Sequence, residues 1–211
     1  MEIAGKSANL EKIADQVARQ PDLLPDIFEG LSADKARVKF GCLKLLRLVS
    51  EKTPAALYPE IDRLFDLLDS QNNIFKWGAI IVIGNLAAVD SAGKIDRRLD
   101  KFLEPISGRG MITAANVVGA AGKIARAKPR LAEKIARALL KVKAAKYQTA
   151  ECRNVVLGHV IESLDLFVGQ NEKRGPIIDF VRRQLRNRRK AVQRKAAKFL
   201  KRHSATGTGS T

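Results

Sequence analysis

The chain has 211 residues, of which 45% are hydrophobic and 5% aromatic, and it carries 39 Lys and Arg against 22 Asp and Glu. This composition provides a core of Leu, Ile, Val and Ala and favours helices over a sheet, which would use more aromatic and β-branched residues. The only cysteines, Cys42 and Cys152, stand in separate apolar stretches, which excludes a disulfide framework and leads us to expect a reducing, cytoplasmic location.

Neither a secretory signal nor a membrane span is expected. The first residues lack a basic region followed by an apolar one, so no signal or transit peptide is predicted. The longest nearly uncharged apolar run, 77–89, is too short to cross a bilayer.

Apolar residues at helical spacing predict a chain of helix pairs joined by short polar turns. A capping helix near 8–19, started by Ser7 or Asn9, precedes five pairs. Pro54, Pro129 and Pro176 stand at the starts of first helices, where a missing N–H costs nothing. The first helices are expected at 22–31, 54–69, 91–107, 129–143 and 176–186, and the second at 35–52, 73–89, 110–127, 148–167 and 189–202.

The second helices contain an internal repeat. Val38-Lys-Phe-Gly-Cys-Leu recurs as Phe75-Lys-Trp-Gly-Ala-Ile, 37 residues later. Ile83-Gly-Asn-Leu-Ala returns as Ala121-Gly-Lys-Ile-Ala at a separation of 38, then more faintly as Leu157-Gly-His-Val-Ile. A last copy, Val192-Gln-Arg-Lys-Ala-Ala, follows a longer spacer. Such a period predicts an array of stacked hairpins, since an isolated amphipathic hairpin cannot bury its apolar face.

This signature, an apolar residue, a basic one, small residues and then Leu/Ile-Gly, resembles HEAT repeats, especially the short kind named after phycobiliprotein lyases. The resemblance implies an all-α fold, a right-handed α-solenoid (α–α superhelix) of about five HEAT-like helix pairs plus the N-terminal capping helix. The second helices would line its concave face. One domain is expected over 1–203, with repeats near 21–52, 53–89, 90–127, 128–168 and 172–203, and a flexible tail at 204–211.

Two repeated positions receive structural interpretations. In HEAT-like units a basic residue at the start of the second helix commonly forms a ladder between repeats, so Lys39 and Lys76 are expected to pair with Asp34 and Asp69. Trp77 stands among small and apolar residues and is expected in the core.

Recognisable catalytic spacings are missing from the sequence. The glycines do not fit phosphate-binding loops and are better explained by close helix packing. No CxxC, HxxxH or HExxH spacing suggests a metal, and no nucleophile is paired with a base. We therefore expect a non-enzymatic scaffold without cofactor, metal or small-molecule substrate.

The charge is unevenly distributed. Residues 1–122 contain 16 Lys and Arg and 16 Asp and Glu, whereas residues 123–211 contain 23 and 6, so the whole net charge of +17 lies in the C-terminal part. On the last helix Lys190, Arg194, Lys198 and Lys201 share a stripe opposite the apolar face of Val192, Ala196, Phe199 and Leu200. The candidate nucleic-acid or anion contacts are Lys123, Arg153, Arg182, Arg183, Arg186, Arg189, Lys190, Arg194, Lys198, Lys201 and Arg202.

A surface of one sign indicates an anionic partner, because a solubilising cap on a terminal repeat needs polarity but not a single sign. Nucleic-acid phosphate is the preferred interpretation. An acidic protein partner, an anionic membrane surface and a merely solubilising role stay open. HEAT-like alkylpurine DNA glycosylases are a further alternative, but they use aromatic residues and a carboxylate in the cleft, and the basic segments here contain hardly any aromatics.

Overall fold

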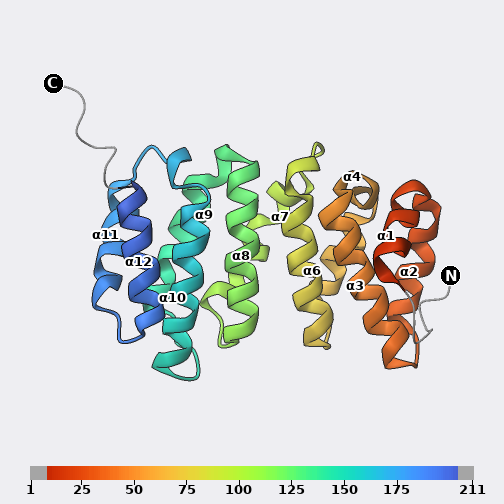
Figure 1. Ribbon diagram of the computed structural model, residues 1–211, viewed down its shortest axis with the longest axis horizontal. Helices are drawn as coiled ribbons and strands as arrows, with labels where there is room; N and C mark the ends of the chain where they lie inside the picture. The colour runs from red at the N-terminus through yellow and green to blue at the C-terminus, as the bar shows by residue number, and fades with distance from the viewer. Residues whose placement is uncertain (1–8, 204–211) are drawn as a thin grey trace. The chain divides into compact units, whose positions relative to one another are not determined.

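The computed structural model describes residues 9–203 and divides the chain into two compact units, one reaching through Ile95 and the other beginning at Asp96 (Figure 1). The regular structure of these residues is helical, without a strand among them, which confirms the all-α prediction. Ser7 and the tail at 204–211 lie outside the described residues. The single domain over 1–203 stays a prediction.

The N-terminal unit holds the capping helix and two hairpins. Asn9 caps α1, because its side-chain oxygen accepts the Lys12 N–H at 3.1 Å. The predicted first helix at 54–69 is wrong in one respect. It breaks at η3 (Tyr58–Glu60), where Pro59 has no N–H to donate and its ring disfavours a continuous helix. The helices are α1 (Leu10–Arg19), α2 (Leu24–Glu29), α3 (Ala36–Lys52), α4 (Pro54–Leu57), α5 (Ile61–Asp66) and α6 (Asn73–Leu86).

The C-terminal unit holds three hairpins. Pro129 is the first residue of η7 (Pro129–Leu131), and Pro176 is the second residue of α11. Both positions suit a residue without an N–H. The hairpins pair α7 with α8, α9 with α10, and α11 with α12. Their helices are α7 (Lys94–Leu103), α8 (Met111–Ala127), α9 (Ala132–Leu140), α10 (Ala150–Asp165), α11 (Gly175–Arg183) and α12 (Lys190–His203).

The backbone repeats the period seen in the sequence. Each first helix ends in a 3₁₀ turn closed by a hydrogen bond of 3.1 or 3.2 Å to the carbonyl three residues earlier. Such bonds satisfy carbonyls that a helix end would otherwise leave without a partner. The donors are Ala33, Ser70, Gly108, Ala145 and Asn187, so the spacing is 37, 38 and 37 residues and then a longer 42.

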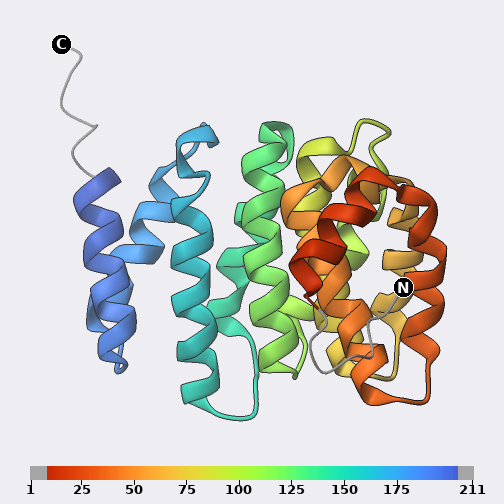
Figure 2. The same ribbon diagram turned by 45° about the vertical axis from the view of Figure 1, so that its right-hand side comes forward.

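The second helices pack side by side within each unit, as α8, α10 and α12 do in Figures 1 and 2. Ser163 of α10 donates to the Val118 carbonyl of α8 at 2.6 Å. A Cβ on Gly122 would lie 2.8 Å from the Ser163 hydroxyl oxygen, so this glycine permits the close approach. The packing interpretation holds there, but not at Gly119, which faces open space.

Ion pairs do connect successive hairpins, but not through the residues predicted. Lys39 and Lys76 form no ion pair with another described residue, so the ladder expected at these positions is wrong. The observed pairs lie at other positions, for example Lys94 with Asp62 at 2.5 Å. Some of these pairs join neighbouring first helices, and others join neighbouring second helices, as Lys195 of α12 and Glu162 of α10 do at 2.7 Å. The side chains that pair are those on the facing sides of stacked helices.

Partial burial of Asp96 opposes its ionisation, but hydrogen bonds from Lys128 and Arg130 outweigh this and lower the pKa of the Asp96 carboxyl. Lys128 is 4% exposed and lies 2.7 Å from Asp96. This buried pair joins the third and fourth hairpins.

Candidate nucleic-acid interface

The last helix has the two faces predicted from its sequence. Val192, Ala196 and Phe199 are buried, while the four stripe residues Lys190, Arg194, Lys198 and Lys201 are exposed. Leu200 is only half-buried. None of the four stripe residues forms an ion pair with another residue of the described chain, so the stripe keeps its charge.

Three of the other candidates gather at the end of α11. Arg182, Arg183 and Arg186 line a depression of about 470 Å³ together with Asp179 and Leu185. Arg182 is bound by Asp179 at 2.6 Å, which leaves Arg183 and Arg186 as the cations able to receive an anion there.

Several candidates are partly neutralised or withdrawn from the surface. Arg189 pairs with Glu151 and Arg202 with Asp165. Lys123 and Arg153 are half-buried. These residues contribute less free charge than their positions in the sequence indicated.

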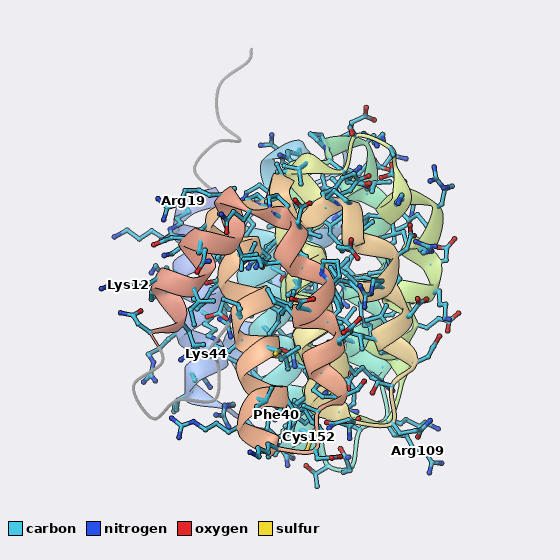
Figure 3. All side chains as sticks on the ribbon, turned by 90° about the vertical axis from the view of Figure 1, so that its right-hand side faces the viewer. Lys12, Arg19, Phe40, Lys44, Arg109 and Cys152 are labelled. Carbon is cyan, nitrogen blue, oxygen red and sulfur yellow. The ribbon has the colours of Figure 1, made fainter. Side chains whose placement is uncertain are left out.

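The structure brings together a set of exposed cations, of which only Arg186 and Lys190 are among the candidates from the sequence. The turns between the first and second helix of each hairpin lie along one edge of the C-terminal unit, at the bottom of Figure 1. Arg109 and Cys152, from two of these hairpins, lie at the lower edge in Figure 3. Arg189 in the last of these turns is paired with Glu151, but six other cations of the turns are exposed and form no ion pair within residues 9–203. The turn edge comprises Arg109, Lys143, Lys146, Arg186, Arg188 and Lys190.

Hydrogen bonds fix neighbouring turns of this edge to one another. The hydroxyl of Tyr147 donates to the Ile106 carbonyl at 2.5 Å, and burial raises the pKa of Tyr147 to about 12. Asn187 donates to the Asn154 side chain at 3.2 Å. The turn edge is therefore a built surface rather than a set of independent loops.

The same turns are joined by an ion pair. The Arg189 guanidinium hydrogen-bonds Glu151 and lowers the pKa of that carboxyl. Glu151 lies in the first turn of α10, so the pair connects the starts of two second helices.

Cations at the start of α12 oppose the stability of the helix. A helix N-terminus carries a partial positive charge, and other helices here place an acidic residue in the first turn, as α1 does with Glu11 and α9 with Glu133. The first turn of α12 has no acidic residue, and Arg188 and Lys190 flank its start. Helix stability does not account for these two residues, whereas Arg186 at the end of η10 (Gln184–Arg186) suits a helix C-terminus.

Aromatic side chains are absent from this surface. The five aromatic residues among 96–203 are each at most 8% exposed, namely Phe102, Tyr147, Phe167, Phe180 and Phe199. The described part of the C-terminal unit thus offers no aromatic platform on which an unpaired base could stack.

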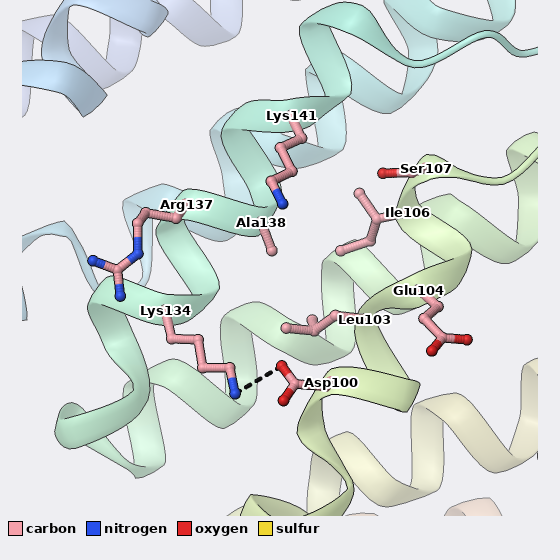
Figure 4. A pocket seen from close by; sticks show the side chains of 9 residues that line it. All are labelled: Asp100, Leu103, Glu104, Ile106, Ser107, Lys134, Arg137, Ala138 and Lys141. Carbon is pink, nitrogen blue, oxygen red and sulfur yellow. Dashed lines mark ion pairs between the residues drawn. The ribbon is translucent and has the colours of Figure 1, made fainter.

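A second depression, of about 490 Å³, lies between α7 and α9 and is drawn in Figure 4. Leu103, Ile106 and Ala138 form its apolar part. The ion pair between Lys134 and Asp100, 2.7 Å long, crosses it and neutralises one of its cations.

The described residues contain no group of three or more His, Cys, Asp or Glu side chains placed to hold a metal ion. Within the same residues, no helix is both long and apolar enough to span a bilayer.

The core position expected for Trp77 is wrong, because the side chain is only half-buried on α6.

Comparison with solved structures decides the fold. A designed armadillo repeat protein, YIII(Dq)4CqI, has a TM-score of 0.57 and 17% identity over 91% of this chain and 89% of that chain. Another, YIII(Dq.V1)4CPAF in complex with peptide (KR)4, has a TM-score of 0.60 and 15% identity over the same shares. The chain is a helical repeat solenoid.

An engineered protein is also similar to this solenoid, with a TM-score of 0.53 and 14% identity over 93% of this chain and 88% of that one. No family model and no curated protein sequence matches the chain. HEAT and armadillo arrays are close relatives among helical repeats, so the resemblance seen in the sequence indicated the correct class of fold. At these identities the likeness establishes the solenoid fold alone.

Proposed function

We propose that the solenoid is a binding scaffold whose C-terminal unit binds the phosphate backbone of double-stranded nucleic acid. The observation that carries the proposal is the turn edge, where six exposed cations without ion-pair partners meet along three successive hairpins. Neighbouring hairpins lie about 10 Å apart, so the edge extends over roughly 20 Å, and duplex DNA presents one charge per about 1.7 Å of its axis. Several phosphates can therefore be contacted at once.

Double-stranded nucleic acid is favoured over single strands for a chemical reason. Proteins that bind single strands stack bases on aromatic side chains, and this unit buries its aromatic residues. The same burial argues against a base-flipping glycosylase, which holds an extruded base between aromatic or apolar side chains. Binding would depend on the backbone and be largely independent of base sequence.

An acidic protein is the second candidate for the same surface. A similar designed solenoid is in complex with a peptide, so a protein partner is compatible with this fold. Cations at the surface would then recognise carboxylates in place of phosphates, with weaker dependence on salt because fewer condensed counterions are released.

The test is a titration of the purified protein with duplex DNA, duplex RNA, single-stranded DNA and polyglutamate at four salt concentrations. We expect the duplexes to bind more tightly than single strands of equal charge, with little dependence on base sequence. Reversing the edge residues Lys143, Lys146, Arg188 and Lys190 to Glu should abolish this binding at physiological salt and leave the helical circular dichroism unchanged. A variant that retains the parent's affinity, or a parent that binds polyglutamate alone, would overturn the proposal.

A further inference from the structure

The N-terminal unit has a charged face that its total charge conceals, since residues 1–95 contain 12 Lys and Arg against 13 Asp and Glu. Acidic residues concentrate on its first helices, for example Asp22, Asp26 and Asp66. Helix α3, a second helix, instead carries five Lys or Arg residues against one acidic residue, Glu51. The two layers of this unit therefore differ in sign, with the excess of cations on the second-helix layer.

Large apolar side chains reach the surface of this same layer. Phe40 of α3 is 36% exposed and Ile74 of α6 is 46% exposed. Trp77 and Ile81 follow Ile74 at i+3 and i+7, so they share one side of α6, and both are half-buried. The ring of Phe40 lies 6.0 Å from that of Phe75, which connects the apolar residues of the two helices.

Side-chain contacts hold α3 and α6 side by side. Asn85 of α6 donates to the Ser50 hydroxyl of α3 at 2.9 Å. A Cβ on Gly78 would lie 2.6 Å from Leu43, so the two helices approach closely at this glycine. The apolar residues of α6 thus form a strip directly beside the exposed side of α3.

Cations border the strip. Lys44 of α3 and Lys12 and Arg19 of α1 are exposed, and none has an ion pair with another described residue. Figure 3 shows these three side chains toward the same side of the molecule. The exposed carboxylate of α3, Glu51, is bound by Arg47 at 2.9 Å. The exposed carboxylates of α1, Glu11 and Asp15, are both bound by Lys52 at 2.7 and 2.8 Å, so the three border cations keep their charge.

An exposed apolar strip beside cations is complementary to a segment that has apolar residues on one side and carboxylates on the other. An amphipathic helix docks through its own apolar residues at i, i+3, i+4 and i+7, and the strip from Ile74 to Ile81 offers apolar side chains for them to pack against. We propose that the face formed by Lys12, Arg19, Phe40, Lys44, Ile74, Trp77 and Ile81 binds an acidic amphipathic helix of a partner protein. This N-terminal face shares no residue with the turn edge, so a result that contradicts one of the two proposals leaves the other untouched.

Trp77 supplies a direct measurement, because it is the single tryptophan of the sequence. The probe is a synthetic helix of about 18 residues with Leu at i, i+3, i+4 and i+7 and Glu at the remaining positions. The full chain should bind it with a saturable blue shift of the Trp77 emission, confirmed by calorimetry. A scrambled peptide of the same composition, which has no apolar side, should bind at least about tenfold more weakly.

Two variants test the two parts of the face. Ile74→Ser removes an exposed apolar side chain, and the double variant Lys12→Glu, Lys44→Glu reverses the charge of the border. Each should weaken binding of the peptide about tenfold or more. Lys173→Glu is the matched control, since Lys173 is also exposed and without an ion pair among the described residues but lies outside both proposed surfaces. It should keep the parent's affinity.

Thermal melts of every variant separate lost binding from lost folding, and both altered sites are exposed enough to keep the parent's melting temperature. Equal affinity for the ordered and scrambled peptides would overturn the proposal. The proposal would also be overturned if Ile74→Ser and the Lys12→Glu, Lys44→Glu double variant both fold and both bind the peptide as tightly as the parent. A shift of Trp77 emission by duplex oligonucleotide and not by the peptide would also overturn it, and would assign the face to nucleic acid.

Discussion

Replacing Arg186, Arg188 and Lys190 together by Gln is the sharpest test of the turn edge. If all six edge cations contact phosphates, log K should fall against log salt with a slope of about −5, since each contact contributes about −0.9 for B-form DNA. Removing three contacts should change this slope to about −3. At 0.15 M salt each contact contributes a factor of about five, so the variant should bind duplex DNA roughly 100- to 200-fold more weakly.

The same variant should fold at least as well as the parent, because Arg188 and Lys190 oppose the dipole at the start of α12. Fluorescence anisotropy with a labelled duplex at four salt concentrations measures the slope, and a thermal melt by circular dichroism measures the stability. Replacing Lys12 and Arg19 by Gln is the matched control and should leave the slope unchanged. An unchanged slope in the triple variant would refute the assignment of these residues, and a large fall in melting temperature would refute the reasoning about the helix dipole.

Two further predictions concern the packing of the C-terminal unit. Asp96→Ala should lower the free energy of unfolding by about 2–3 kcal/mol in urea denaturation at pH 7, because it leaves the buried Lys128 ammonium without its carboxylate. The pKa of Asp96 is lowered in the folded state, so its stabilisation is present above the unfolded pKa of about 3.9 and is lost as pH falls through the folded pKa. The difference between the two proteins should therefore shrink below about pH 4, and a difference that persists in acid would contradict this origin. Gly122→Ala should cost about 1–3 kcal/mol because its Cβ meets Ser163, whereas Gly119→Ala on the same helix should stabilise by up to about 1 kcal/mol. Equal melting temperatures for the two alanine variants would show that α10 simply moves away.

Much of the fold was predictable because it depends on local periodicity. The recurrence at 37 and 38 residues determined the number and order of the hairpins, and the same spacing appears in the backbone turns from Ala33 to Ala145. Pro129 and Pro176 marked helix starts correctly. Pro59 was the overlooked signal, since a proline inside a predicted helix removes a donor and breaks it.

The two faces of α12 also followed from the sequence, because a helix of period 3.6 fixes which residues share a side. The sequence likewise determined that the net positive charge lies after residue 122. What it could not determine is which cations are already neutralised. Arg189 is bound by Glu151, 38 residues away, and Arg202 by Asp165, 37 residues away, so these pairs form only when hairpins stack.

Tertiary structure alone decided where the free charge gathers. Arg109 lies in a segment of neutral composition, yet hairpin stacking places its turn along the same edge as the turns that carry Lys146 and Arg188. Stacking likewise left Trp77 half-buried, because α6 has one side that neither α3 nor its own hairpin partner covers. The physical reason is the same in both cases. Periodicity fixes the direction of a side chain relative to its own helix, whereas exposure and pairing depend on neighbours about one repeat away in the sequence.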